Sequence, residues 1–400
     1  MITKITIFSI TVLLVLMTPY TATPATEWHG SLSDGRTISQ EDLAAILKAH
    51  AEWVVSEGER GTRADLSGAM LVKATFTGVD LSEADLSNAN LRGADLRNAS
   101  LIGARLIGAE LNEADLTDAS LYQAIVSGAR LQEARLTKAF LVETKLDAAT
   151  LWSADLRGAD LRDTDLSGAE LNRARLNHAL FEPKPGSITK PVYIGTAQGL
   201  WSLWFRDSPH GLVELRDGFR KAGLRRPERE VTFAIERTWR RKMWKEQGFV
   251  GKLKSGAKYL LFELTCDYGM SPGRPLSILA LLVFIFVLPY ALSLTSGGRE
   301  GIWRVWSPDR VRQDLGGTEP ESIRAGPFRA VAISLYFSVL SAFRMGWRDI
   351  NVGNWIARIQ PREYTLRATG WVRVVSGVQS LISVYLLALW AITAFGRPFQ

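Results

Sequence analysis

Between residues 66 and 181, a large apolar residue recurs at every fifth position without interruption. Of these 24 positions, 21 are leucine, and the others are Phe76, Val126 and Phe181. The residue two places before each of them is alanine in 21 cases, and the exceptions are Val79, Thr144 and Thr164. A period of five matches neither the 3.6-residue period of a helix nor the two-residue period of a strand. The pattern predicts a solenoid over residues 62–181, whose stacked coils bury these side chains in one core.

The repeated unit, for example ADLSNANLRGADLRNASL at 84–101, resembles that of the pentapeptide-repeat family. The resemblance implies a β-solenoid, a right-handed quadrilateral β-helix with four pentapeptides in each coil. The 24 units would then make about six coils, and a column roughly 29 Å tall at ~4.8 Å per strand. Only a residue as small as alanine fits the second inward position at each corner, and polar residues fill the outward positions.

The segments on either side of the repeat are predicted to close it. Ser39 and Asp42 form a capping pattern before apolar residues at helical spacing, which predicts a capping helix over 39–58. After Phe181 the chain is rich in proline, so we expect the solenoid to end there and residues 182–200 to form a linker.

Two long uncharged stretches, 275–298 and 374–396, are predicted to be transmembrane helices, because about 20 helical residues cross the hydrocarbon of a bilayer. At the N-terminus, Ile5 to Met17 is an apolar run after Lys4. It predicts a signal peptide over residues 1–25, and the alternative is an uncleaved N-terminal anchor. The sequence therefore predicts a protein of the bacterial inner membrane with two spans.

A third apolar stretch, Ala330 to Phe343, is too short to span a membrane and lies between the two spans. This order of a span, a short helix and a second span resembles the pore domain of two-span potassium channels. The resemblance implies a re-entrant helix and filter loop over 327–353. In that family the filter ends in Thr-x-Gly-Tyr-Gly-Asp. The corresponding pore-like residues here are Arg344, Met345, Gly346, Trp347, Arg348 and Asp349.

This filter is degenerate, because Arg344 replaces the threonine and Arg348 replaces the second glycine, whereas Gly346 and Asp349 match. A potassium filter coordinates the ion with backbone carbonyls, and arginines beside it would repel a cation. The resemblance therefore implies a pore that prefers anions or is closed, or a module that only anchors. A conducting form would be a homo-oligomer, expected to be a tetramer.

Charge divides the chain, with a net of −6 over residues 1–200 and +13 over 201–400. Residues 201–274 are predicted to be a basic amphipathic helical segment. Its basic cluster consists of Arg237, Arg240, Arg241, Lys242 and Lys245. Two interpretations remain open: the helix lies on an anionic bilayer surface, or it packs within the protein with its charges in water.

Candidate catalytic chemistry is sparse. Cys266 is the only cysteine and the four histidines are far apart, so we expect no metal, no cofactor and no enzymatic activity. Some pentapeptide-repeat proteins resemble a DNA duplex in shape and charge and bind topoisomerases, but residues 62–181 carry 17 acidic and 13 basic residues, a mixed surface that favours a solvated scaffold face. No nucleic-acid partner is expected. The expected partners are the lipid bilayer and an unknown protein on the repeat surface.

Two functions follow from these features: a membrane-anchored, non-enzymatic scaffold or binding protein, and a channel-like protein. If the signal peptide is cleaved, the repeat is periplasmic; otherwise it is cytoplasmic. Eight Lys and Arg residues near the spans lie on the side of the loop between them and three on the other, which favours the periplasm for the repeat.

Overall fold

The computed structural model describes residues 28–246, 248–295, 301–306, 321–343 and 364–395. The predicted signal peptide lies outside the described residues. The chain divides into two compact units, residues 1–222 and 223–400.

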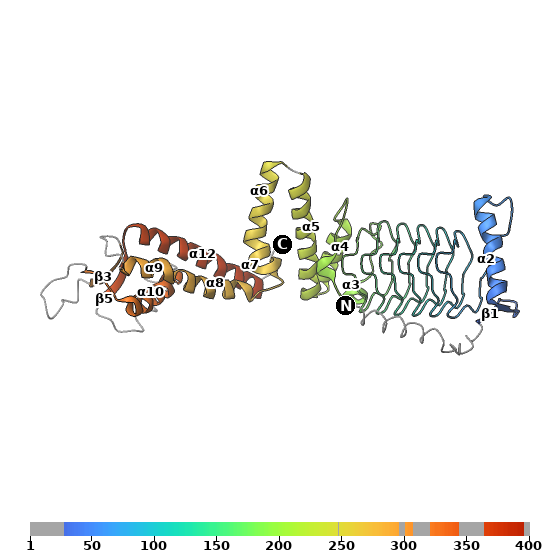
Figure 1. Cartoon of the computed structure of the whole chain (residues 1–400), viewed down its shortest axis with the longest axis horizontal. Coiled ribbons are helices and arrows are strands. Elements are labelled where there is room, and N and C mark those ends of the chain that lie inside the picture. Colours follow the sequence, from blue (N-terminus) through green and yellow to red (C-terminus); the bar gives the residue numbers. More distant parts are fainter. Residues whose placement is uncertain (1–27, 247, 296–300, 307–320, 344–363, 396–400) are drawn as a thin grey trace, which may run out of the picture. The chain divides into compact units, whose positions relative to one another are not determined.

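The first unit is built around a β-solenoid (Figure 1). Its bridge partners lie 20 residues apart, which gives 20 residues per coil. Parallel bridges pair each residue of a corner strand with the residue 20 positions later, from Asp65 with Asp85 to Asp160 with Leu180. Backbone hydrogen bonds join the coils, and the first runs from the N–H of Leu66 to the carbonyl of Asp85 at 2.8 Å. The leucine and alanine positions are buried, so the predicted inward residues form the core.

Each corner of the solenoid is a turn that needs a left-handed residue. The second residue after each repeat leucine has positive φ at all 23 positions from Gly68 to His178. Eight of the 23 are glycine, which adopts this conformation without steric cost. At the others, such as Glu83 and Ala148, a side chain is held in the left-handed region by the packing of the coil.

Two of the exceptions to alanine form hydrogen bonds inside the core. Thr144 and Thr164 occupy the same position in successive coils, and both are buried. The Thr144 hydroxyl donates to the carbonyl of Leu121 at 2.7 Å, and that of Thr164 to the carbonyl of Leu141 at 2.9 Å. Their polar atoms are therefore satisfied within the stack, as burial requires.

A hairpin and a helix cover the N-terminal end of the solenoid. Strands β1 (His29–Ser31) and β2 (Thr37–Ser39) are antiparallel, and Ser31 also pairs with Met70 of the first coil. Helix α2 spans Gln40–Val55 and begins with a capping box between Ser39 and Asp42. Burial lowers the pKa of His50, which keeps the imidazole neutral, and its Nδ1 accepts a hydrogen bond from the N–H of Ala64 at 3.1 Å.

The prediction of a linker over 182–200 is wrong, because this segment forms a further, irregular coil. Leu166 donates to Ser187 at 3.0 Å and Phe181 to Trp204 at 2.9 Å, so the inter-coil bonding continues to residue 204. Proline lacks the backbone N–H but keeps its carbonyl. In this coil, backbone carbonyls accept hydrogen bonds from N–H groups of the preceding coil, so the prolines do not interrupt the stack.

The C-terminal end of the solenoid is closed by short helices: α3 (Pro191–Ile194), η1 (Leu200–Ser202) and α4 (His210–Lys221). Leu212, Leu215 and Phe219 of α4 are buried. Because the first compact unit extends to residue 222, the predicted basic segment 201–274 belongs to two units and is not one element.

The second unit is mostly helical. Its elements before the first apolar helix are α5 (Arg225–Glu246), α6 (Phe249–Lys258), the π-helix η2 (Tyr259–Glu263), α7 (Leu264–Cys266) and η3 (Asp267–Gly269). They are followed by α8 (Arg274–Ile285), α9 (Val287–Thr295), β3 (Ile302–Trp306), β4 (Glu321–Ser322), α10 (Pro327–Ala342), β5 (Tyr364–Ala368) and α12 (Gly370–Phe395).

A small antiparallel sheet, in the order β4-β3-β5, lies between the apolar helices in sequence and was not predicted. Ile302 of β3 and Ala368 of β5 are buried in one cluster with Tyr290 of α9, Phe337 of α10 and Val372 of α12. The sheet therefore shares a core with three helices, α9, α10 and α12.

Candidate functional site

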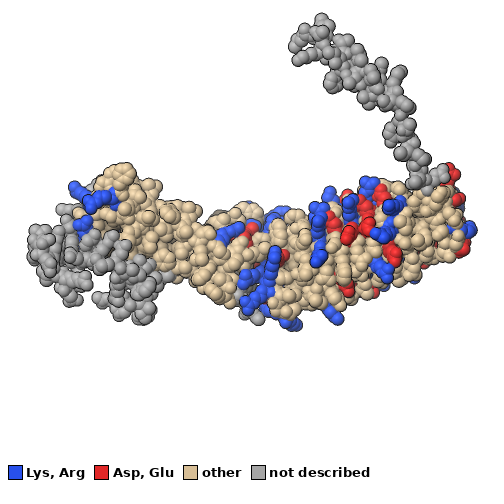
Figure 2. All heavy atoms as spheres, turned by 90° about the horizontal axis from the view of Figure 1, so that it is seen from below, with Lys and Arg blue, Asp and Glu red and all other residues tan. Residues whose placement is uncertain are grey.

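Two helical segments of the second unit are long and apolar enough to cross a membrane. They are Arg274–Thr295, formed by α8 and α9, and α12, with 22 and 26 residues. Both expose large apolar side chains, including Phe284 and Leu288 on the first and Leu381 on the second. Figure 2 shows the face of this part of the molecule almost without charged side chains. The described residues of the predicted spans 275–298 and 374–396 fall on these helices, and residues 296–298 and 396 lie outside the described part of the chain.

The short apolar helix α10 packs between the two long segments through a polar seam. The Tyr290 hydroxyl donates to Oε1 of Gln379 at 2.8 Å, and Nε2 of Gln379 donates to the hydroxyl oxygen of Ser338 at 2.8 Å. The Ser341 and Ser376 hydroxyls are 2.9 Å apart. All five residues are buried. In a bilayer such groups must find partners within the protein, and this seam supplies them.

The predicted filter-like loop lies outside the described residues. This applies to all six candidate positions: Arg344, Met345, Gly346, Trp347, Arg348 and Asp349. Within the predicted re-entrant segment 327–353, the structure describes α10 and Phe343. The structure therefore describes the module before residue 344 and again from Tyr364 onwards.

The predicted basic cluster lies on α5, and the structure assigns different surroundings to its members. Arg240 is paired with Glu263 of η2 at 2.6 Å, and its guanidinium lies 5.3 Å from the ring centroid of Tyr259. Arg237 lies over Phe233 and Lys242 over Trp239. The remaining two members, Arg241 and Lys245, are exposed. The sequence identified these cations, but not which of them are paired.

A pocket of about 490 Å³ lies between α5 and the α6–η2 helix, beside this cluster. It is lined by Arg240, Arg241, Trp244, Lys245, Ser255, Gly256, Tyr259 and Leu260. The Ser255 hydroxyl donates to the carbonyl of Arg240 at 3.0 Å, and Lys258 pairs with Glu236 at 2.7 Å, so the two helices are held together. Three of the eight lining residues are cationic and none is acidic.

Sequence analysis missed an exposed apolar stripe on α6 and the helical turns that follow it. Its members are exposed at helical spacing, and Phe249 is the most exposed at 82%. The stripe consists of Phe249, Val250, Leu253, Leu260, Leu261 and Leu264. The spacing was visible in the sequence, but exposure depends on which face packs against α5. On α5 itself, Val231 and Ile235 are buried.

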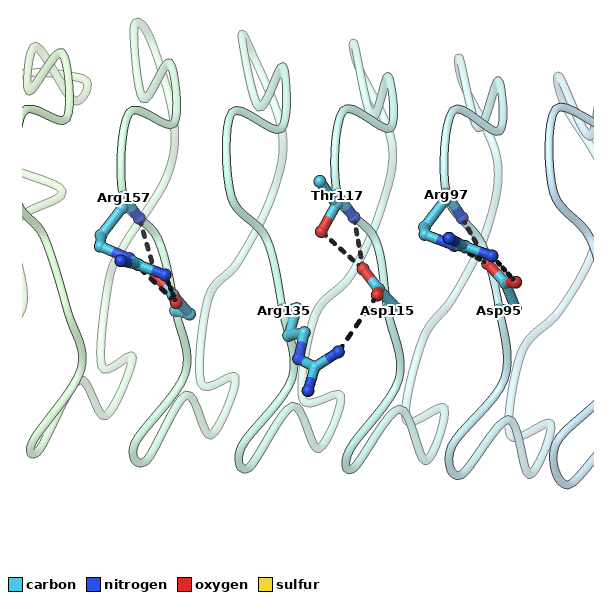
Figure 3. Close-up of polar contacts among 7 residues, drawn as sticks. Asp95, Arg97, Asp115, Thr117, Arg135 and Arg157 are labelled. Carbon is cyan, nitrogen blue, oxygen red and sulfur yellow. Dashed lines mark hydrogen bonds and ion pairs between the residues drawn. The ribbon is translucent and has the colours of Figure 1, made fainter. Parts of the chain in front are cut away.

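The outer face of the solenoid carries carboxylate–guanidinium pairs of two kinds (Figure 3). Within a corner, Arg97 pairs with Asp95 at 2.6 Å, and hydrogen bonds from Arg97 lower the pKa of Asp95 to about 2. Between coils, Arg135 lies 3.5 Å from Asp115. Figure 2 shows the two signs of charge interspersed over this unit. The pairs leave a mixed surface and no block of one sign on the face drawn.

An apolar patch around Tyr122 interrupts this polar surface. Tyr122 and Phe140 are in ring contact at 6.2 Å, and Ile102 and Val142 occupy the positions one coil before and after Tyr122 on the same face. Phe140 and Ile102 are about 40% exposed. The Tyr122 hydroxyl donates to Glu143 at 3.2 Å, which places a carboxylate at the edge of the patch.

The described residues contain no group of three or more His, Cys, Asp and Glu side chains arranged to hold a metal ion. Cys266 is buried, and burial raises the pKa of its thiol, so the thiolate form is disfavoured at neutral pH.

Comparison with known proteins identifies the repeat. The family model described as pentapeptide repeats matches residues 62–98, 99–137, 124–163 and 144–182. Residues 62–182 are therefore a pentapeptide-repeat region. No curated protein matches the chain.

Several solved structures are similar to this region. One is HetL, a pentapeptide-repeat protein involved in heterocyst differentiation regulation from the cyanobacterium Nostoc sp. strain PCC 7120, with 31% identity over 31% of this chain and a TM-score of 0.19. This chain spans 64% of the length of HetL.

A second is a pentapeptide-repeat protein from the Arabidopsis thaliana thylakoid lumen, with 26% identity, 34% of this chain and 84% of that chain covered, and a TM-score of 0.18. A third, also from Nostoc PCC 7120, is 31% identical over 29% of this chain and 80% of its own, with a TM-score of 0.13.

Proposed function

We propose that this chain, in which residues 62–182 are pentapeptide repeats, is a non-enzymatic scaffold or binding protein anchored in the bacterial inner membrane by two spans. The observation that supports it most strongly is the pair of span-length helices with exposed apolar faces, α8–α9 and α12. Exposed leucine and phenylalanine side chains on both helices favour contact with lipid over contact with water.

The repeat region supports the scaffold part of the proposal. Its core is filled by leucine and alanine, so the column is a packed body whose outer face is available for binding. The patch formed by Ile102, Tyr122 and Phe140 is the best candidate surface for a protein partner, since aromatic side chains are enriched where proteins associate. The charge count near the spans favours a periplasmic repeat.

The anchoring is tested by alkaline carbonate extraction of membranes from cells that express the full chain. The wild type is expected to stay in the membrane pellet. Leu381→Arg should move a large part of the protein to the supernatant or lead to its degradation, because an arginine at the centre of a span costs about 2.5–3.5 kcal/mol in insertion.

The matched control is Trp371→Arg, which introduces the same charge near the end of α12, where a long side chain can reach the interface. This variant should stay in the pellet. Release of the wild type by carbonate would contradict the proposal of two spans.

A second candidate function is a channel-like protein with a degenerate filter that is not selective for potassium. It is favoured by the packing of α10 against both long segments, for example the contact of Tyr290 with Phe337 at 5.0 Å and the bond from Gln379 to Ser338. A conducting form requires an oligomer, because two spans and one loop do not enclose a pore.

The channel is tested by ion flux in liposomes with the wild type, Gly346→Leu and Arg348→Gly. Flux that is lost in the first variant and changes selectivity in the second would support a pore. Flux that appears only in Arg348→Gly would indicate a pore closed by its arginines. Absence of flux from all three folded proteins would leave the scaffold.

A further inference from the structure

The pocket between α5 and α6 combines cations, aromatic rings and an adjoining apolar stripe. We infer that it binds the phosphate of an anionic phospholipid, whose acyl chains lie along the stripe of α6 and η2. The inference rests on the proposed membrane location and names a ligand class for it.

The charge of the pocket is suited to a phosphate. Arg240 forms an ion pair with Glu263 at 2.6 Å, which neutralises its charge and fixes its side chain at the edge of the pocket. Arg241 and Lys245, one turn apart on α5, form no ion pair with any described residue and line the same opening. Two cations without acidic neighbours in the lining attract a single anionic group, and a guanidinium binds phosphate oxygens with particular strength.

The rest of the lining is suited to the boundary between headgroups and acyl chains. Trp244 and Tyr259 line the pocket with Leu260, and both aromatic types are enriched at membrane interfaces. The volume of about 490 Å³ falls within the range of small-molecule sites, about 300–1,000 Å³. Small residues on the α6 side, Ser255 and Gly256, leave room between the helices.

The stripe argues for a lipid over a soluble phosphate compound. Leu260 belongs to both the pocket and the stripe, so the cationic site opens directly onto exposed apolar surface. A helix with a continuous apolar face lies in the interface plane of a bilayer, with that face towards the acyl chains. Lys252 and Lys254 of α6 are exposed and do not line the pocket.

The pocket is also linked to the proposed spans. The π-helix η2 and helix α7 lead from α6 to α8 with Arg274 at its start, and Arg274 pairs with Asp267 at 2.7 Å. On the other span, the hydroxyl of Tyr385 in α12 donates to the carbonyl of Leu261. These contacts hold η2 and α7 beside the proposed spans and leave the apolar side chains of the stripe exposed.

The test measures lipid binding to the purified full chain by native mass spectrometry, with palmitoyl-oleoyl phosphatidylglycerol as the probe and the matching phosphatidylcholine as reference. The wild type should prefer the anionic lipid by about tenfold or more, since each cation near a lipid surface contributes about 1 kcal/mol. Arg241→Gln with Lys245→Gln should remove this preference, and Arg241→Lys with Lys245→Arg should keep most of it.

The matched control is Lys252→Gln with Lys254→Gln, which removes the same charge from α6 outside the pocket lining. It should retain the preference. Equal loss in the two glutamine variants would overturn the inference, because general surface charge would explain the binding. A wild type without preference, while still in the carbonate pellet, would overturn the lipid site and leave the anchoring intact.

Soluble glycerol phosphate provides the last comparison. It should displace the labelled phospholipid only at far higher concentration, because it lacks the acyl chains that contact the stripe. Displacement at equal concentration would show a site for soluble phosphates and would overturn the inference of a lipid.

Discussion

At the scale of single residues, the solenoid depends on a conformation that most amino acids avoid. At every corner one residue is left-handed, and 15 of the 23 are not glycine. Each such side chain costs roughly 1–2 kcal/mol locally, and the cost is met by the inter-coil hydrogen bonds and the buried leucine next to it. Glycine at these positions therefore reduces strain at no loss of core packing.

Ala148→Gly is expected to stabilise the repeat by about 0.5–1 kcal/mol, because Ala148 is exposed with a φ of 55° and glycine adopts this value freely. The neighbouring Ala149→Gly is the control, since Ala149 is buried in the core and its loss should destabilise. Thermal unfolding of the full chain, followed by circular dichroism, measures both. A lower melting temperature for Ala148→Gly would contradict the argument.

The pair of Asp95 and Arg97 predicts a pH dependence. The folded pKa of Asp95 is about 2, below its ordinary 3.8, so the contribution of the pair is present above pH 3.8 and is lost as the pH falls towards 2. The effect should stay under about 1 kcal/mol, because the pair is half exposed. The free energy of unfolding, measured in urea, should fall less steeply between pH 5 and pH 2 for Asp95→Asn than for the wild type. Parallel slopes would contradict the assignment.

At the scale of elements, the second unit is organised by the polar seam around α10. Gln379 of α12 bonds to Tyr290 of α9 and to Ser338 of α10, so one amide links three helices. Ser334 of α10 is also buried, and its hydroxyl has no hydrogen-bond partner among the described residues. The seam specifies how the helices face one another, because apolar side chains alone discriminate little between rotations in lipid.

Gln379→Leu is expected to lower the stability of the module in detergent by about 0.6–1.7 kcal/mol, since it leaves the Tyr290 hydroxyl without its acceptor. Adding Tyr290→Phe should restore part of the loss, because both polar groups are then absent. Unfolding in a mixed-micelle denaturant series measures these variants. The control is Val378→Leu at the neighbouring exposed position, which should leave the stability unchanged. If it lowers the stability as much as Gln379→Leu does, the loss comes from any change in this part of the helix and not from the hydrogen bond.

At the scale of the whole molecule, the two compact units each have their own core. The first is a column of leucine and alanine, and the second is a set of apolar helices joined by a small sheet.

Leu116→Ala is expected to destabilise the repeat by about 2–5 kcal/mol, because Leu116 is fully buried and its stacked neighbours are fixed by inter-coil bonds. In detergent, the unfolding transition of the repeat should move to a lower midpoint, while the midpoint of the transition followed by the helical signal of the second unit should stay the same. A common shift of both transitions would show that the units unfold together.

The inward and outward positions of the repeat could be predicted from the sequence because each coil contacts only its neighbours. The leucine at every fifth position and the alanine two places before it are enough to identify the side chains that face the core. The two apolar helices could also be predicted, since their length and hydropathy are local properties. The resemblance supplied the handedness and the number of sides, which the periodicity alone does not contain.

Tertiary structure alone decided the rest. The coil at 182–204 has no five-residue period, and its place in the stack depends on which carbonyls face the N–H groups of the coil before it. The pairing of Arg240 with Glu263 and the exposure of the α6 stripe depend on how α6 folds back on α5. Such contacts join residues that no local pattern links, because burial is determined by the neighbour that a face meets and not by the face itself.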